Sequence, residues 1–423
     1  LALAACLLIG AVGLAAQTDV IGPNSYPDGI NPLTGLSVDN PDDLDRRPLV
    51  IKISNYPPEI RPQAGLNSAE VVWEHLLAGG VTRFAAVFLA TDLDHVGPIR
   101  SARLIDFELT RIYDALFVYS GMAQGTLDRL RADGVVSSRI VGGAGPCPAL
   151  CRFPREGLAL EHTLFGDMNA LRDLAVEMGR DVVPETVSGM AFSESIPSDG
   201  IGLDSIRISY RRTTVEWVHD PESGRWLRNQ DGAPHFAAET DTQINAANVL
   251  ILEADHVEQP FTRDGYWGPP NYAFTVELTG SGRIFLLRDG QYIEGEWRRD
   301  SPDAPLLFFD TVGNVLPFKP GNTFVNVVPR WQNGYELTFV LAAPLTATIT
   351  TPGGVNLRLG PAQAYASPDV AYPGDEFRAV GRDRNGSWVQ LLRPNGEVLW
   401  AAAETLVLDG DVFSLPFSRS TFE

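Results

Sequence analysis

The sequence is poor in lysine and in positive charge. Of its 33 basic residues only Lys52 and Lys319 are lysines, and the formal net charge is −20. A chain this acidic repels a phosphate backbone, so no nucleic acid is expected as a partner in the absence of a local basic site. The scarcity of lysine is consistent with a base-composition bias, and we infer no function from it.

The sequence also lacks the short motifs of several enzyme classes. It contains no Gly-x-Ser-x-Gly elbow, no phosphate-binding loop with its lysine and no dinucleotide fingerprint. The glycine-rich run Gly142-Gly143-Ala144-Gly145 has no lysine after it and is interpreted as a turn. The six histidines do not follow a metal-ligand spacing. We therefore expect neither a metal nor a cofactor.

A long uncharged apolar run occurs only at residues 1–16, LALAACLLIGAVGLAA. It is shorter than the roughly 20 residues of a membrane-spanning helix. Gly13 and Ala15 fit a secretory cleavage site, so the run is predicted to be a signal peptide or an uncleaved anchor. Alternatively, Leu3-Ala4-Ala5-Cys6 resembles a lipobox with lipidation at Cys6. Either interpretation predicts an extracytoplasmic protein of the cell envelope, secreted or membrane-anchored, that contacts the membrane through this segment only.

Only three cysteines are present, and two of them lie close together at Cys147 and Cys151. Two nearby cysteines in a loop of an exported protein most often form a disulfide. A zinc site formed by the two cysteines and His162 would lack a fourth ligand. A redox-active pair typically has the spacing Cys-x-x-Cys, which is one residue shorter than the spacing here. The prediction is a structural disulfide between Cys147 and Cys151.

The 423 residues are enough for several domains. The predicted fold class is α/β, with a layered α/β N-terminal domain, a β-rich second domain and a small C-terminal β-barrel. The predicted segments are a leader at 1–16, a polar linker or ordered loop at 17–47, domains at 48–200, 201–343 and 345–410, and a tail at 411–423.

Strand and helix patterns alternate in the first domain, as expected of α/β layers. Strands are predicted at 48–54, 81–90 and 115–120, and helices at 68–77, 101–113, near 127–132, and from a cap at Thr163 to about Met178. The second domain instead has short β-branched and aromatic runs. They are separated by turn signals such as Asp231-Gly232 and Asp289-Gly290, which predict hairpins.

Four stretches, taken together, resemble the YerB-like family, whose members are described as putative lipoproteins. They are residues 31–36 (NPLTGL), 61–66 (RPQAGL), 79–84 (GGVTRF) and 97–103 (GPIRSAR). The second domain is similar to the family's β-rich domain around Tyr210, 220–224, 231–232 and 290–300. The resemblance covers about residues 31–330. It implies a fold and an envelope location, and no activity is established for the family.

The C-terminal unit resembles a bacterial SH3-like domain through residues 355–361, Pro373-Gly374-Asp375 and Gly386-Ser387-Trp388. Such domains often bind peptidoglycan or peptides, so the resemblance implies peptidoglycan or an envelope protein as partner. Tyr365 and Tyr372 are candidates for a ligand groove. Trp388 is expected to fill the small core.

A group of arginines is the strongest candidate for a functional site in the sequence. Arg100 and Arg103 would share a helix face if a helix begins near residues 98–101, and Arg83 could join them. Cations are disfavoured at a helix N-terminus, so something anionic should offset them. One interpretation is a phosphate or carboxylate ligand held by the guanidinium groups. The other is structural ion pairing with Glu70, Glu74 or Asp106.

Two functions follow from these alternatives. The first is a non-enzymatic envelope protein that binds or scaffolds, with a wall-facing C-terminal module. The second is an enzyme acting on a phosphate-bearing envelope substrate, with Glu70, Glu74, Asp114 or His162 as candidates for acid/base work.

Overall fold

The computed structural model describes residues 20–77, 79–141, 147–184, 189–195, 200–259, 273–330, 335–342, 345–383, 385–393, 395 and 397–415. The predicted leader with Cys6, the glycine-rich run at 142–145 and the end of the predicted tail lie outside them. Among the described residues no helix is long and apolar enough to cross a membrane.

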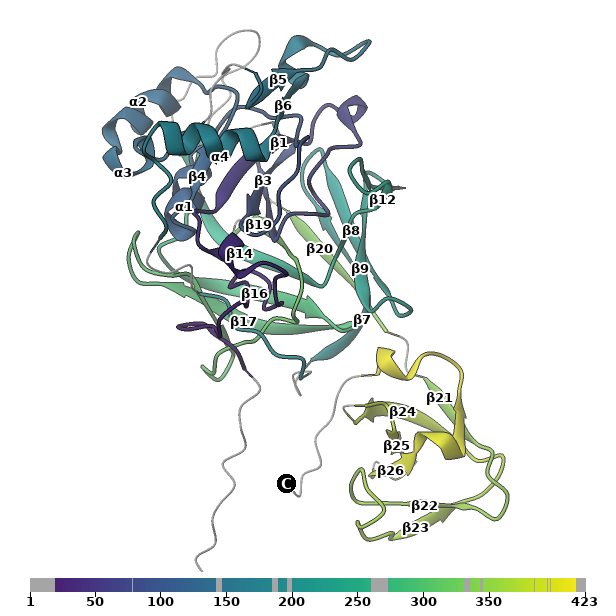
Figure 1. The fold of residues 1–423 in the computed structure, drawn as a ribbon. Coiled ribbons are helices and arrows are strands. Elements are labelled where there is room, and N and C mark those ends of the chain that lie inside the picture. Colours follow the sequence, from purple (N-terminus) through teal and green to yellow (C-terminus); the bar gives the residue numbers. More distant parts are fainter. Residues whose placement is uncertain are drawn as a thin grey trace, which may run out of the picture.

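One large mixed sheet organises the chain (Figure 1). Its strands, in spatial order, are β10 (Ala233–Pro234), β9 (Arg225–Gln230), β8 (Thr214–Asp220), β7 (Ile201–Ser209), β17 (Gln291–Arg299), β16 (Gly280–Arg288), β14 (Asn248–Gln259), β19 (Thr323–Pro329), β2 (Val71–Leu76), β3 (Thr82–Phe88), β1 (Leu49–Ser54) and β4 (Leu116–Val118). Beside this path lie β13 (Asn245–Ala246), β15 (Ala273–Glu277), β18 (Leu307–Asp310) and β20 (Glu336–Leu341).

The sheet crosses the boundary predicted between residues 200 and 201. The join is a parallel pairing of β19 with β2, in which Thr323 lies opposite Val71. On its other side β19 pairs in parallel with β14. The two predicted domains therefore contribute strands to one hydrogen-bonded unit, which is mostly β.

Helices cover the β1–β4 end of the sheet: α1 (Ile105–Ile112), α2 (Gln124–Ala132), α3 (Gly134–Ser137) and α4 (Met168–Glu177). Short 3-10 turns are η1 (Pro41–Leu44), η2 (Pro58–Ile60) and η3 (Leu160–His162). Small two-stranded sheets pair β5 (Leu150–Arg152) with β6 (Leu164–Gly166), and β11 (Phe236–Ala237) with β12 (Thr242–Gln243). The predicted disulfide between Cys147 and Cys151 is present and ties the residues before β5 to Cys151 of that strand.

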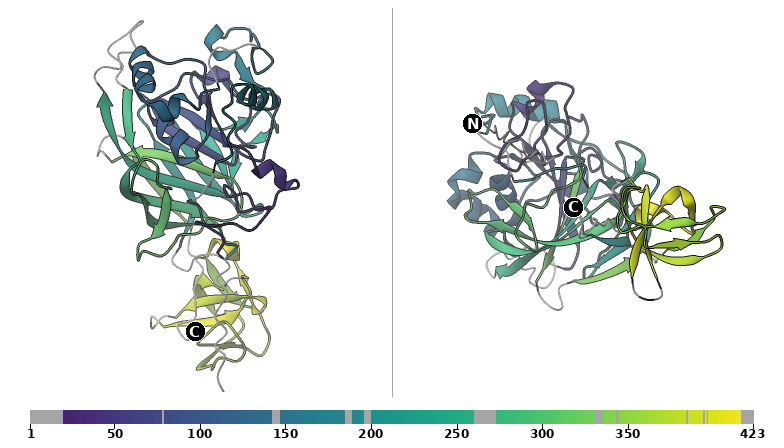
Figure 2. Two further views of the ribbon diagram at one scale, coloured as in Figure 1. Left: turned by 60° about the vertical axis from the view of Figure 1, so that its left-hand side comes forward. Right: turned by 90° about the horizontal axis from the view of Figure 1, so that it is seen from below.

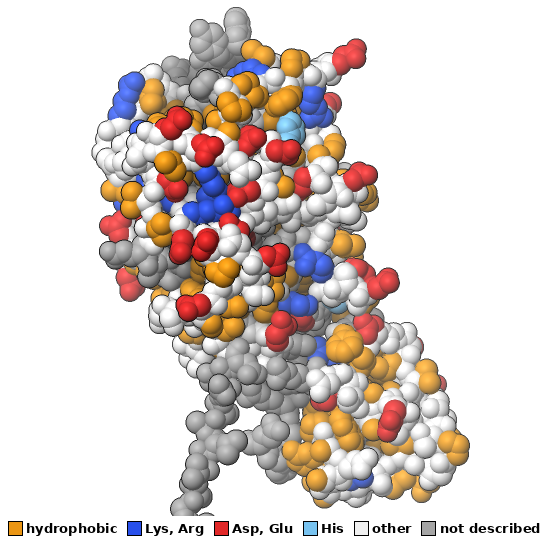
Figure 3. Space-filling model, in the orientation of Figure 1, with side chains coloured by type: hydrophobic (Ala, Val, Ile, Leu, Met, Phe, Trp, Pro, Cys, Tyr) orange, Lys and Arg blue, Asp and Glu red, His pale blue; other side chains and the backbone are white. Residues whose placement is uncertain are grey.

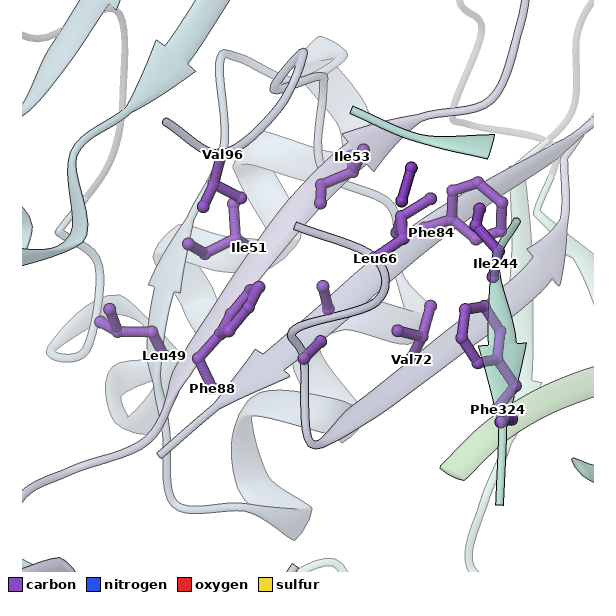
Figure 4. Packing of buried hydrophobic residues seen from close by; sticks show 14 of the residues in the cluster. Leu49, Ile51, Ile53, Leu66, Val72, Phe84, Phe88, Val96, Ile244 and Phe324 are labelled. Atoms are coloured by element: carbon purple, nitrogen blue, oxygen red, sulfur yellow. The ribbon is translucent and has the colours of Figure 1, made fainter. Parts of the chain in front are cut away.

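Both faces of the central strands are buried. In β14, Val249 and Ile251 join one core, and Leu250 and Leu252 join the other. Figure 4 shows part of the first core, where side chains of β1, β2 and β3 converge with Phe324. Helix α4 packs into this core, and α1 packs into the second. A strand buried on both faces has no polar alternation, which explains one error in the sequence prediction.

That error is the helix predicted at 68–77, which is strand β2. Every residue of β2 is buried, so apolar side chains at neighbouring positions gave a helix-like spacing by chance. The predicted cap at Thr163 is also wrong. The helix begins at Met168, and Asp167 caps it by accepting a hydrogen bond from Ala170 N at 3.0 Å.

Residues 345–415 form a second body with its own core (Figure 2). A five-stranded sheet contains, in spatial order, β26 (Val398–Ala402), β25 (Trp388–Leu392), β24 (Glu376–Arg382), β21 (Thr346–Ile349) and β27 (Leu406–Leu408). A separate pair joins β22 (Val355–Leu357) to β23 (Asp369–Ala371). The unit also contains η4 (Ala403–Thr405) and η5 (Val412–Ser414). Trp400 is buried, whereas Trp388 is half-buried rather than fully in the core.

Candidate functional site

The predicted helix start at 98–101 is not observed. Helix α1 begins at Ile105, so Arg100 and Arg103 precede it in an extended segment. This segment lies against β1, where Ser54 N donates to Pro98 O and Arg100 N donates to Lys52 O, both at 2.9 Å. The prediction that Arg100 and Arg103 share a helix face is therefore wrong, and β1 positions Arg100.

Arg83 extends from β3 toward the same segment. Its Nη1 donates to Ser101 O at 2.8 Å, and its side chain is buried. Arg103 Nη1 donates to Ala102 O at 2.8 Å. We call Arg83, Arg100 and Arg103 the arginine cluster.

Arg100 is paired with an acid that the sequence did not indicate for this role. Its Nη2 lies 3.1 Å from Glu161 Oε1, and its Nη1 donates to Glu161 O at 3.3 Å. Glu161 is 59% exposed at its side chain, and the neighbouring His162 is buried. Among the described residues, Arg100 Nε and His162 Nδ1 are buried without a hydrogen-bond partner.

A fully buried ion pair lies beneath the arginine cluster. Lys52 Nζ is 2.6 Å from Asp106 Oδ1, and both side chains are inaccessible to solvent. Lys52 Nζ also lies against His75 Nε2, while His75 Nδ1 faces Leu76 O at 3.2 Å. Asp106 Oδ2 accepts from Arg103 N at 2.6 Å, which ties this lysine triad of Lys52, His75 and Asp106 to the arginine segment.

Burial and like charge lower the proton affinity of these groups. Burial lowers the pKa of Lys52 to about 8, against the opposing effect of Asp106. Burial, then the charge of Lys52, holds the pKa of His75 well below its usual value. Burial lowers the pKa of His162, and the charges of Arg100 and Arg83 add to that effect. Both histidines are therefore neutral near pH 7.

The other acid/base candidates lie elsewhere. Glu70 accepts from the backbone N–H groups of Leu89, Ala90 and Thr91, at 2.8–3.1 Å. Asp114 pairs with Arg139 and Arg47. In the described structure neither carboxylate is bonded to the arginine cluster.

Glu74 projects to the opposite face of β2 from His75, because successive strand residues alternate. There it forms a fully buried pair with Arg228, with Oε2 2.8 Å from Nη2. It also accepts from Thr82 Oγ1 at 2.6 Å and from Asn326 Nδ2 at 2.9 Å. Its oxygens are occupied by a structural network that joins β2 to β9 and β19.

Tyr365 and Tyr372 differ in environment. Tyr372 is 60% exposed, whereas Tyr365 is half-buried against Gly360. Arg358 Nη1 donates to Tyr365 O at 2.8 Å. Among the residues that the structure describes, no group of three or more His, Cys, Asp and Glu side chains could hold a metal ion.

The comparisons with known proteins concern the large sheet. Residues 33–180 match the model described as "Protein of unknown function (DUF3048) N-terminal domain", and residues 205–325 match its C-terminal counterpart. Together these matches support a YerB-like family. The relative named "Putative lipoprotein YerB" of Bacillus subtilis (strain 168) is 28% identical over 305 residues, covering 70% of this chain and 86% of the relative.

A solved structure supports the same relationship. The crystal structure of the YerB protein from Bacillus subtilis matches with a TM-score of 0.60 and 25% identity, over 73% of this chain and 99% of that one. Both descriptions of the family leave activity open.

The YerB-like resemblance drawn from short motifs therefore agrees with these matches. Two of its stretches, at 79–84 and 97–103, contain all three arginines of the cluster. Sequence reasoning missed Lys52 and His75. The signal that could have indicated Lys52 is its rarity, because a chain with arginine at nearly every basic position keeps lysine here.

Proposed function

We propose that this chain is an exported, envelope-associated binding protein that holds an anionic ligand at the arginine cluster. The observation that carries the proposal is the pairing of Arg100 with a solvent-exposed carboxylate, beside buried polar atoms of Arg100 and His162 that no described group satisfies.

An exposed acid is a replaceable partner. The Glu161 side chain is 59% exposed and can turn into solvent, whereas the Arg100 side chain is only 16% exposed and still needs an anionic partner when it does. A phosphate or carboxylate in its place would receive charge-assisted hydrogen bonds from the guanidinium group. It could also meet Arg100 Nε, which is buried without a described partner. In the unliganded protein, the Glu161 carboxylate occupies the position that the ligand's anionic group would take.

The lysine triad fixes the backbone of the segment that carries Arg100 and Arg103. The Lys52 ammonium and the Asp106 carboxylate fix the backbone at Arg103, and the Lys52 carbonyl accepts from Arg100 N. The segment that presents the cluster is thus held at both ends by one buried pair. Side chains fixed in this way bind a ligand with a smaller entropic cost.

The envelope location rests on the relatives and on residues 1–16. A relative is named a lipoprotein, and the leader carries Cys6 in a lipobox-like context. Lipidation at Cys6 or retention of the apolar run would each place the binding site outside the cytoplasm.

The C-terminal unit is proposed to face the cell wall as an SH3-like module. Its separate core and its short strands joined by Gly and Pro turns support that assignment. Tyr372, with its exposed ring, is the stronger of the two groove candidates for contact with peptidoglycan or a peptide.

The enzymatic alternative has less support. It needs a base near the arginines, and Glu70, Glu74 and Asp114 are each bonded to other groups. His162 lies beside Arg100, but its side chain is buried. Lys52 has a suitable pKa of about 8 but is fully buried. Binding is therefore the function that the geometry supports best.

Thermal melting with phosphate, pyrophosphate and muropeptides tests the proposal. We expect at least one of these anions to raise the melting temperature of the wild type, because a ligand that binds only the native state stabilises it. Arg100→Gln should lose that shift and keep its own melting temperature within a few degrees. If no anion protects the wild type and Arg100→Gln itself melts early, the cluster is structural.

A further inference from the structure

A second polar site lies in a cleft of about 470 Å³ that contains none of the arginine cluster. It is lined by residues between 31 and 43, by residues 67–70 and 90–91, by Arg225 of β9, and by Gly321 and Asn322 just before β19. Its walls combine the first YerB-like stretch with the residues that follow the second one. Gly321 N donates to Thr34 O at 2.8 Å, and Thr323 N donates to Glu70 O at 3.0 Å, so the walls are hydrogen-bonded together. The function proposed above does not use this cleft.

Arg225 of β9 lines the cleft and has only neutral partners. Its Nη2 donates to Asn322 Oδ1 at 2.5 Å, and its Nε donates to Asn245 Oδ1. A guanidinium group has five N–H donors, so three remain after these two bonds. Burial lowers the pKa of Arg225, and no acidic group offsets that effect.

The side chain is nevertheless held rigidly. Asn322 also accepts from Ala247 N at 3.1 Å and donates to Asn245 O at 3.0 Å, and Asn245 Nδ2 donates to Gln243 O at 2.9 Å. The two side-chain amides that bind Arg225 are therefore themselves fixed. Arg225 lines the cleft and is bonded only to neutral amides, so an anionic ligand there would supply the charged hydrogen-bond acceptor that its guanidinium group lacks.

The acidic residues of the cleft favour an anion of low charge. Glu70, Asp39 and Asp43 also line it. These carboxylates repel a doubly charged phosphate more strongly than a single carboxylate. Asp39 is exposed and forms no ion pair among the described residues, so it can receive an ammonium group.

We propose that this cleft binds an amino acid or the end of a short peptide, with the ligand's carboxylate on Arg225 and its ammonium group toward Asp39. The site is separate from the arginine cluster and takes a zwitterion rather than a multiply charged anion.

Calorimetric titration of the full chain with L-Ala-L-Ala, its N-acetyl derivative and its C-terminal amide tests the proposal. We expect the dipeptide to bind in the millimolar range or tighter, the N-acetyl derivative to bind more weakly and the amide not to bind. Arg225→Gln should weaken dipeptide binding about tenfold or more, since it removes a charge-assisted bidentate contact.

Ser37→Trp provides a second variant that leaves the Arg225 network intact. Ser37 lines the cleft and is exposed, so a bulky ring there should block entry without disturbing the fold. Arg211→Gln, at an exposed arginine outside the cleft, is the control and should bind as the wild type does. Absence of binding by all three probes, equal binding of the amide, or unchanged binding by Ser37→Trp would each overturn the proposal. Arg100→Gln should not affect dipeptide binding, which separates this test from that of the proposed function.

Discussion

At the scale of single residues, Lys52 shows how a rare side chain can mark a constrained position. Its ammonium group sits between Asp106 and His75 with no solvent access. An ammonium is a compact point charge, whereas the planar guanidinium of arginine needs more room and five hydrogen-bond acceptors. The single Lys52 ammonium is thus matched here by two side-chain partners, the Asp106 carboxylate and His75 Nε2.

The lowered pKa of Lys52 gives a pH-dependent stability. In the folded protein its pKa is about 8, below the value of about 10.4 in an unfolded chain. Between these values the unfolded state binds more protons, so this group's contribution to the free energy of unfolding rises with pH and is constant below about 8.

We predict that the wild type gains stability over that interval relative to a Lys52→Met/Asp106→Asn double variant, by on the order of 3 kcal/mol. Urea unfolding of both proteins across the interval measures the difference. A constant difference across it would show that Lys52 stays protonated in the folded state. The single variant Lys52→Met should lose about 3–5 kcal/mol, because it leaves Asp106 buried and unpaired.

At the scale of elements, the strands that were predicted correctly are those bounded by recognisable turn sequences. Asp231 and Asp289 have positive φ values of 54° and 52°, as the Asp-Gly turns required. Strands β8 and β16, which lie beside these turns, belong to the second domain, for which short β-branched and aromatic runs were predicted. The conformation of such a turn depends on neighbouring residues only, so it can be recognised in a single sequence.

Strand β2 could not be found in that way. Its neighbour β19 is about 250 residues away, and the parallel pairing of Thr323 with Val71 has no local signal. The candidate site shows the same limit. Arg83, Arg100 and Arg103 were found through motifs. Glu161, on η3, and Lys52, on β1, reach them only through tertiary contacts.

The network around Glu74 is predicted to hold β2 to β9. Glu74→Gln leaves Arg228 buried and charged, and should lower the free energy of unfolding by about 3–5 kcal/mol. Urea unfolding measures the loss. Glu216→Gln is the matched control, since its partner Arg207 is 54% exposed and the change should cost less than about 1 kcal/mol. Equal effects of the two variants would contradict the structural role assigned to Glu74.

At the scale of the whole molecule, acidic side chains are spread over the face shown in Figure 3, as the net charge of −20 requires. Such a surface repels anions at long range. A cationic site must then act at short range, through the fixed donors of a cluster or a cleft.

The C-terminal unit is predicted to fold by itself. Its core, which includes Ala347, Leu357, Val389 and Leu399, is a cluster distinct from those of the large sheet. A fragment of residues 345–415 should give a dispersed amide NMR spectrum, and peptidoglycan fragments should shift resonances near Tyr372. A collapsed spectrum would show that the unit depends on the larger body, and a folded fragment without shifts would leave it a spacer.

The central claim is that the arginine cluster holds an anion in place of Glu161. Isothermal titration of pyrophosphate into the wild type, Arg100→Gln and the control Arg131→Gln, an exposed arginine on α2, tests it most directly. The account predicts saturable one-to-one binding to the wild type and to Arg131→Gln, with affinity reduced about tenfold or more in Arg100→Gln. Glu161→Gln should bind more tightly than the wild type, because the competing carboxylate is gone. No binding of pyrophosphate, phosphate or a muropeptide to the wild type, or equal binding to Arg100→Gln, would contradict the account.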